Sequence, residues 1–300
     1  MGIDYRHEPT VEYGVELTCS QLIRRVVAKN PSPFTYHGTQ TYVVGRGNVV
    51  LVDPGPLLPE HVDALLALLA GETITHVLVT HTHLDHSPAT KLLAQRIGAP
   101  TYGFGPHGEG RYERGERVEA GADLDFVPQV RLAHGQVIEG DGFTLECVHT
   151  PGHCSNHLCY RVREERVLLT GDHVMGWSTT VVSPPDGDMG DYMASLQSLL
   201  ERDDRVYLPA HGPEISEPQA FTRSLIEHRL EREAQILQSV TQGRERIAED
   251  MVPVMYANVP AYLHGAAARS VFAHVLHLLE RGQLSCDAET PSLKARYRLR

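Results

Sequence analysis

The sequence lacks the marks of an exported, membrane-spanning or disulfide-stabilised protein. Its first residues include no apolar core of a secretory signal, and no stretch approaches the roughly 18 consecutive apolar residues of a transmembrane helix. The five cysteines are odd in number and form no C-x-x-C pair, so a disulfide framework is not expected. We therefore expect a cytoplasmic protein without a membrane segment.

Lysine is scarce as well. Only Lys29, Lys91 and Lys294 occur, whereas the chain holds 18 histidines. The formal net charge of −11 argues against a strongly basic nucleic-acid binder. A chain of 300 residues, 41% of them hydrophobic, can form one large domain and a small one. Histidine is in marked excess over lysine.

The first two thirds of the chain alternate short β-branched runs with amphipathic helical patterns, which predicts an α/β domain. Residues 103–121 contain six glycines among many charges and predict an exposed loop. Strands are expected at residues 41–45, 48–53, 74–80, 144–149, 157–160, 167–170 and 206–208. Helices are expected at residues 59–70, 88–97 (with Ser87 as the N-cap) and about 191–200.

The pattern changes near residue 217, where we place a domain boundary. Helical periodicity dominates beyond it, at residues 219–242, 244–256 and 261–281, before a short strand at 296–300. In the first of these helices, Arg229 and Glu233 stand at i and i+4; we expect a solvated pair, and docking near the active site is the lesser alternative. Residues 1–217 hold 16 Lys and Arg against 29 Asp and Glu, a net charge of −13. Residues 218–300 hold 11 against 9, a net charge of +2. The acidity therefore belongs to the first domain.

A run of potential metal ligands, His81-Thr82-His83-Leu84-Asp85-His86, directly follows the buried strand expected at residues 74–80. In extended chain, His81 and His83 point to the same side and can bind one ion. Asp85 and His86 lie where the chain turns and can face a neighbouring ion. Imidazole nitrogens with carboxylate oxygens suit zinc, and less firmly iron or manganese.

Three more candidates follow expected strands: His153 in T-P-G-H, Asp172 in G-D-H and His211 in P-A-H-G. Each one alone is more simply explained as a capping or packing residue. Together with the histidine run, and in this order, they predict a metal site.

The order H-x-H-x-D-H, P-G-H, G-D and A-H-G resembles the metallo-β-lactamase superfamily over roughly residues 36–212. This resemblance implies a four-layer αβ/βα sandwich with a binuclear metal site at one edge, between two sheets. Carried over by position, the first metal would be bound by His81, His83 and His153. The second would be bound by Asp85, His86 and His211, and Asp172 would bridge the two.

Further segments resemble the β-lactamase-like protein 2 branch of that superfamily. They are residues 30–35, the G-T-Q-T-Y motif at 38–42 and the loop at 177–189. Residues 259–278 are similar to that branch's small helical, winged-helix-like C-terminal domain. Gln40 stands where the branch usually has asparagine, which leaves the contact made by this motif open.

The resemblance implies a hydrolase in which two zinc ions share a hydroxide that attacks a carbonyl carbon or a phosphorus. The absence of a G-x-S-x-G motif agrees with this. Asp85 would take part in catalysis as a ligand. Asp53 is either a residue that orients a ligand histidine or a plain turn residue. His157 would donate a proton or bind substrate, or else would pack on a strand. His173 is expected to point away from the metals.

Three alternative functions remain, and they differ in what the protein acts on or binds. Some members of the branch are endoribonucleases, which favours a phosphodiester in single-stranded RNA, whereas the acidic first domain opposes it. The second alternative is a small-molecule ester, thioester or lactone. The third is nucleic-acid or protein binding through the C-terminal domain. The helix expected at 261–281 has only Arg269 and Arg281 as cations, which is few for a groove-binding helix, so a lid or a homodimer contact is favoured.

Overall fold

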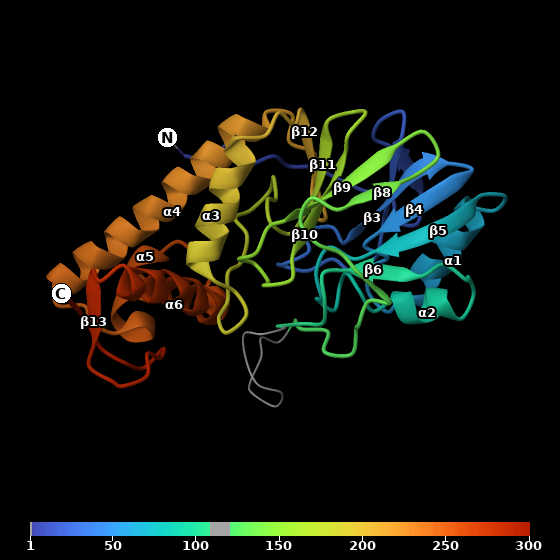
Figure 1. The fold of residues 1–300 in the computed structure, drawn as a ribbon. Coiled ribbons are helices and arrows are strands. Elements are labelled where there is room, and N and C mark those ends of the chain that lie inside the picture. Colours follow the sequence, from blue (N-terminus) through green and yellow to red (C-terminus); the bar gives the residue numbers. More distant parts are fainter. Residues whose placement is uncertain (1, 109–120) are drawn as a thin grey trace.

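Two β-sheets packed face to face, with helices on both outer sides, form the main body of the protein (Figure 1). The structure is a computed structural model that describes residues 2–108 and 121–300. One sheet has the strand order β1-β2-β3-β4-β5-β6-β7 and the other the order β12-β11-β10-β9-β8. The predicted four-layer sandwich is confirmed.

All seven strands expected in this body are present, and the described residues form five more that the sequence did not predict, at residues 16–18, 23–27, 101–103, 130–131 and 137–139. The first sheet consists of β1 (Glu16–Thr18), β2 (Ile23–Val27), β3 (Gln40–Arg46), β4 (Asn48–Val52), β5 (Thr73–Leu78), β6 (Thr101–Gly103) and β7 (Val130–Arg131). The second consists of β8 (Val137–Glu139), β9 (Thr144–His149), β10 (Leu158–Val162), β11 (Val167–Gly171) and β12 (Val206–Pro209). The helices are α1 (Pro59–Leu68), α2 (Thr90–Ala94) and α3 (Met189–Leu200).

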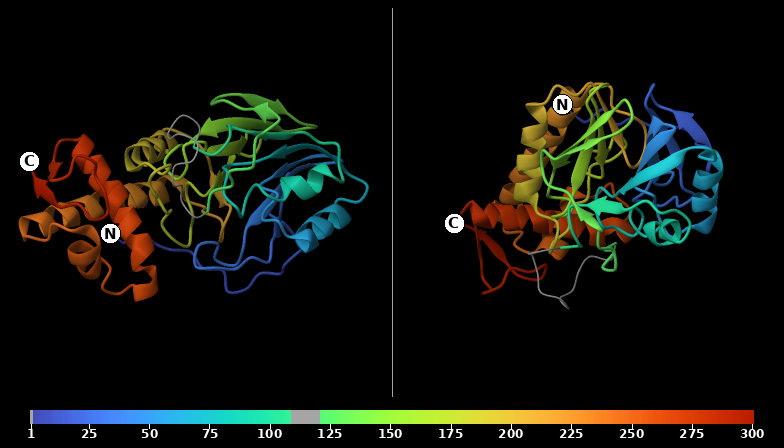
Figure 2. Two further views of the ribbon diagram at one scale, coloured as in Figure 1. Left: turned by 90° about the horizontal axis from the view of Figure 1, so that it is seen from below. Right: turned by 45° about the vertical axis from the view of Figure 1, so that its right-hand side comes forward.

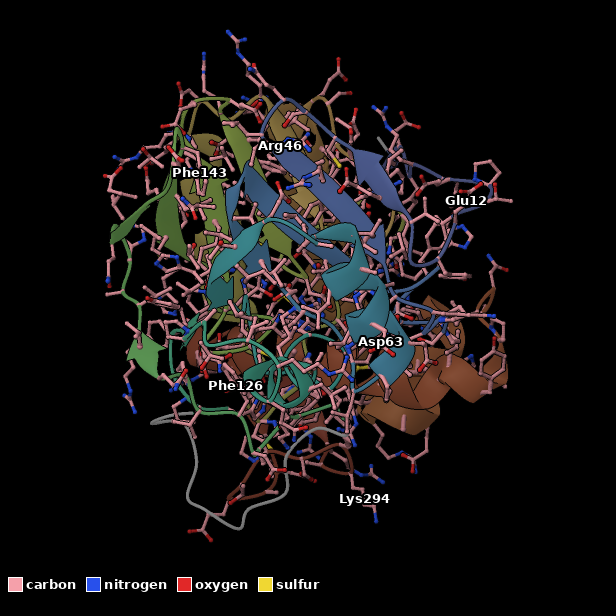
Figure 3. The ribbon with its side chains drawn as sticks, turned by 90° about the vertical axis from the view of Figure 1, so that its right-hand side faces the viewer. Glu12, Arg46, Asp63, Phe126, Phe143 and Lys294 are labelled. Atoms are coloured by element: carbon pink, nitrogen blue, oxygen red, sulfur yellow. The ribbon has the colours of Figure 1, made fainter. Side chains whose placement is uncertain are left out.

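Alternating apolar residues in the central strands fill two cores at once, because successive side chains point to opposite faces of a sheet. In β4, Val50 and Val52 pack between the two sheets. Val49 and Leu51 pack on the other side, against α1 and α2. Figure 3 looks onto this outer helical layer, where Asp63 on α1 faces solvent.

The C-terminal part lies to one side of the sheets, next to α3 (Figure 2). It consists of α4 (Pro218–Thr241), a π-helical turn η1 (Ile247–Met251), α5 (Val252–Met255), η2 (Ala261–Leu263) and α6 (His264–Glu280). Two short antiparallel strands, β13 (Leu284–Cys286) and β14 (Tyr297–Leu299), complete it. The sequence predicted the last strand but not its partner.

The long helix α4 contributes to two cores. Its first half places Phe221 and Leu225 against α3 and the second sheet. Its second half places Ile236 and Val240 in the core of the C-terminal part. The domain boundary near residue 217 therefore remains a proposal, because the helix that starts there packs on both sides.

Some expected elements differ in detail. The helix expected at 88–97 is the shorter α2, and Ser87 does not cap it, because its hydroxyl donates to Asp123 at 2.5 Å. The helix expected at 244–256 divides into η1 and α5. Most of the loop expected at 103–121 lies outside the described residues. Among the described residues, no helix has the length and hydrophobicity needed to cross a membrane.

Candidate metal centre

All seven predicted ligands lie together at one edge of the sandwich. The run from His81 to His86 follows β5, and the other three follow β9, β11 and β12. Because β5 runs parallel to β4 and β11 parallel to β12, the carboxyl ends of these strands meet at this edge. The topology thus brings together residues that are up to 130 positions apart in the sequence, from His81 to His211.

Three histidines form the first cluster. The distance from His81 Nε2 to His83 Nδ1 is 3.0 Å, and that from His83 Nδ1 to His153 Nε2 is 3.1 Å. Asp172 Oδ2 lies 3.7 Å from His153 Nε2. Cys154 is buried with its Sγ 3.3 Å from His83 Nε2, the nitrogen that does not face the cluster.

The second cluster contains two histidines and two aspartates. His211 Nε2 lies 3.1 Å from Asp85 Oδ2 and 3.2 Å from Asp172 Oδ1. His86 Nε2 lies 3.3 Å from Asp85 Oδ2 and 3.5 Å from Asp172 Oδ1. Each carboxylate oxygen of Asp172 therefore faces a different cluster, which is the arrangement expected of a bridging ligand.

These clusters fit divalent cations in two respects. Ligand atoms bound to one tetrahedral Zn²⁺ at 2.0–2.1 Å lie about 3.3 Å apart, and the separations above surround that value. In addition, His86 Nε2, His211 Nε2 and Asp172 Oδ1 are buried and, although these nitrogens lie 3.2–3.5 Å from that oxygen, none makes a well-aligned hydrogen bond among the described residues. Buried polar atoms without partners are rare, and a shared cation satisfies all three.

Burial and charge act differently on the two clusters. Burial lowers the pKa of His81 well below its usual range and that of His153 to about 4, which favours the neutral imidazole that binds metals. Burial alone would also lower the pKa of His211, but the carboxylates of Asp172 and Asp85 raise it to about 10. The second cluster therefore favours positive charge at its centre.

Asp53 orients one ligand of the second cluster. Its Oδ2 lies 2.9 Å from His86 Nδ1, and its Oδ1 accepts from the backbone N–H of Thr80 at 2.7 Å. These contacts favour the interpretation of Asp53 as an orienting residue over that of a plain turn residue. The carboxylate fixes the ring so that His86 Nε2 faces the cluster.

Gln40 holds the loop that carries His211. Its Nε2 donates to the carbonyls of Pro209 at 3.1 Å and Gly212 at 2.5 Å. Tyr42 Oη also donates to Pro209 O, at 2.7 Å, and His211 Nδ1 lies 3.2 Å from Gly38 O. The G-T-Q-T-Y motif thus contacts the ligand loop from the first sheet, which answers the question that the sequence left open.

His157 is fully buried beneath the clusters, and burial lowers its pKa well below the usual range. Its Nε2 accepts from the backbone N–H of Asp172 at 3.2 Å, and its Nδ1 lies 2.9 Å from Thr150 Oγ1. Gly171 has φ +51°, and a Cβ there would lie 2.6 Å from His157 Nε2. Because both ring nitrogens of His157 already have hydrogen-bond partners, the structure favours a positioning role for this residue.

Sequence reasoning missed the segment that supports His153 and Asp172 from outside. His153 Nδ1 lies 2.6 Å from Val181 O, and Thr180 Oγ1 donates to Asp172 O at 2.7 Å. These contacts use backbone carbonyls, which any residue supplies, so no motif marks them.

Arg229 on α4 completes this support, because its guanidinium donates to Thr180 O. The expectation of a solvated Arg229–Glu233 pair is wrong, since both side chains are buried. Glu233 instead accepts from His277 Nδ1 at 2.7 Å and from Arg281 at 3.2 Å. Arg229 thus docks α4 next to the metal centre, the role that the sequence left as the lesser alternative.

The two clusters open into a pocket of about 490 Å³. Its polar floor includes His83, Asp85, His153 and Asp172. The remaining lining is largely apolar and includes Phe34, Met175, Val181 and Ala266. This is the size and character of a site for a small organic ligand.

The sandwich with paired histidine and aspartate clusters at its edge defines the class of protein, a two-sheet α/β fold with a candidate metal centre. Residues 35–211 match the metallo-beta-lactamase superfamily, and residues 248–289 match the beta-lactamase associated winged helix domain. The chain therefore belongs to the metallo-beta-lactamase superfamily, whose members are hydrolases and typically bind divalent metals.

Two relatives and one solved structure illustrate the likeness. The beta-lactamase-like protein 2 homolog of Caenorhabditis elegans is 32% identical over 84% of this chain and 82% of its own length. An atrochrysone carboxyl ACP thioesterase of Claviceps purpurea is 32% identical over 78% and 72%. A beta-lactamase domain protein from Burkholderia ambifaria shares the fold, with a TM-score of 0.82 and 20% identity over 99% and 97%.

Proposed function

We propose that the protein hydrolyses a carboxylic thioester with the help of two divalent cations. The observation that carries this proposal is that both clusters open into one pocket with a largely apolar lining. Zn²⁺ is the proposed ion, with iron or manganese as alternatives. Bound there, such ions would supply a water activated near neutral pH and polarise the scissile carbonyl.

Each predicted site residue has a proposed part in this chemistry. The first ion would be held by His81, His83 and His153, and the second by Asp85, His86 and His211. Asp172 would contact both ions. The neutral ring of His157 would hold the backbone of Asp172 in place, so that its carboxylate reaches both clusters.

The pocket favours an acyl substrate over single-stranded RNA. Proteins that bind single strands follow the backbone phosphates with a basic groove and stack the bases on aromatic side chains. The described lining of this pocket contains one arginine, Arg269, and one aromatic ring, Phe34, apart from the ligand histidines. The Claviceps relative is named a thioesterase, which agrees with the preference for an acyl substrate over RNA.

The test is a substrate panel on zinc-loaded and metal-stripped protein. We expect turnover of an acyl thioester that is lost on chelation and returns with Zn²⁺. D85A should lower kcat/KM at least about a hundredfold, since it removes an oxygen from the second cluster. D63A, which removes an exposed carboxylate on α1 (Figure 3), is the matched control and should retain activity.

A short RNA and a lactone complete the panel. Metal-dependent cleavage of the RNA without turnover of any thioester would replace the proposal by the phosphodiester alternative. Metal analysis that gives fewer than about one ion per chain, after mild purification of a folded protein, would contradict the binuclear centre itself.

A further inference from the structure

The helix α6 supplies part of the pocket wall from the C-terminal part of the chain. Ala266 and Arg269 lie three positions apart, on one face of the helix, and both line the pocket. On the other side of α6, Ala267, Ala268 and Val271 pack into the C-terminal core. That packing fixes which face of α6 the pocket receives.

Arg269 is the cation that the C-terminal part of the chain contributes to the pocket. It is exposed and forms no ion pair or hydrogen bond with any residue that the structure describes. Some cations of this part are paired, since Arg281 donates to Glu233 at 3.2 Å and Arg246 lies 3.1 Å from Asp250, whereas the exposed Lys294 also has no ion pair with a described residue but lies outside the pocket. Arg269 is also the one lysine or arginine among the described residues that line the pocket.

An unpaired guanidinium in a ligand pocket has a defined chemical preference. Its planar fork of N–H donors matches the oxygens of a carboxylate or a phosphate and binds either in a bidentate manner. The apolar side chains of Phe34, Met175 and Val181 suit an uncharged body instead. The pocket thus combines an apolar wall with a single anion-binding group.

We propose that Arg269 binds an anionic group of the substrate, so that the preferred thioesters carry a negative charge on the acyl chain or on the thiol arm. The inference rests on the proposed thioester hydrolysis and narrows its substrate class. With the charged end at Arg269 and the apolar body along Phe34 and Val181, the thioester carbonyl faces the two ligand clusters.

Three matched thioesters test the proposal and distinguish the sources of charge. Hexanoyl-N-acetylcysteamine is uncharged, adipoyl-N-acetylcysteamine carries a carboxylate on the acyl chain, and hexanoyl-4′-phosphopantetheine carries a phosphate on the thiol arm. R269A should lower kcat/KM about tenfold or more for at least one charged substrate, and leave the uncharged one within about twofold. R269K should retain part of the preference.

K294A is the matched control, because Lys294 is an exposed cation of the same part of the chain outside the pocket (Figure 3). It should leave all three substrates unchanged. Equal losses on all three substrates in R269A would overturn the proposal, since they would indicate a displaced helix. Unchanged kinetics in R269A would overturn it as well.

A binding measurement separates this inference from the proposed function. The S-hexyl thioether is uncharged, and the S-carboxypentyl thioether carries a carboxylate. Neither contains a thioester bond, so both resist hydrolysis, and calorimetry measures the Kd of each. If no thioester is hydrolysed but R269A still weakens only the charged thioethers, the anion site stands and the thioesterase proposal fails. If thioesters are hydrolysed but neither turnover nor binding depends on the charge of the ligand or on Arg269, the thioesterase proposal stands and the anion site fails.

Discussion

At the scale of single residues, the metal centre depends on a backbone conformation that few residue types adopt. Asp53 has φ +52°, the left-handed region in which Asp and Asn are the commonest residues after Gly. This conformation coincides with its contacts to Thr80 and His86. The Asp53 carboxylate therefore contacts both Thr80, just after β5, and the ring of His86.

Removing this carboxylate should weaken the second cluster. In D53A, His86 Nδ1 loses its acceptor, and we expect the affinity for the more weakly bound ion to fall about 10- to 100-fold. Competition with a chromophoric chelator measures this. D53N keeps an oxygen acceptor in place and should recover part of the loss. Two ions bound with unchanged affinity in both variants would contradict the orienting role.

Residue types predicted which side chains meet at the edge of the sandwich, but not the groups that support them. The ligands His81, His83 and Asp85 carry chemistry in the side chain and follow one another at fixed spacing after a strand, so the sequence shows them directly. The supports at Thr180 and Val181 act through backbone carbonyls. A carbonyl belongs to every residue, so only the fold shows which one is used.

At the scale of elements, α4 connects the C-terminal part to the metal centre. Arg229 lies between the two apolar halves of α4 and is 2% exposed. Its guanidinium lies 5.1 Å from the ring centre of Tyr192 and donates a hydrogen bond to Thr180 O. Helical periodicity predicted the helix but assigned Arg229 and Glu233 to a solvated face. A pattern of polar positions cannot tell water from a polar partner on another element.

Loss of this contact should destabilise the fold and the centre together. We expect R229A to lower the free energy of unfolding by about 1–3 kcal/mol, because it leaves a buried carbonyl without its charged donor. Urea denaturation measures this, and the rate of zinc loss to a chelator should rise in parallel. R223A removes an exposed arginine from the same helix and should change neither. Equal behaviour of the two variants would contradict this assignment.

At the scale of the whole molecule, the alternation of strand-like and helical patterns predicted an α/β domain, and the resemblance to the superfamily implied its four layers. The relation between the two parts of the chain could not be predicted in the same way. Phe221 and Leu225 belong to the core of the sandwich, although the change in sequence pattern falls before them. Composition changes where the strands end, whereas packing continues along α4.

Truncation tests where the sandwich ends. A chain of residues 1–217 lacks Phe221 and Leu225, and the loss of two such side chains from a core costs about 2–5 kcal/mol each. We expect it to unfold at a clearly lower temperature than a chain of residues 1–242, followed by circular dichroism. Equal Tm values would place the end of the sandwich near residue 217.

The pocket is lined by residues of the sandwich and by residues of α6, and these two parts of the chain have different proposed roles. Every proposed metal ligand lies at or before His211, whereas Ala266 and Arg269 come from α6. Substitutions in α6 can therefore change which molecules enter without altering the bond-breaking centre. Reactivity and selectivity are separately heritable in such an arrangement, so related chains can diverge in substrate while keeping one chemistry.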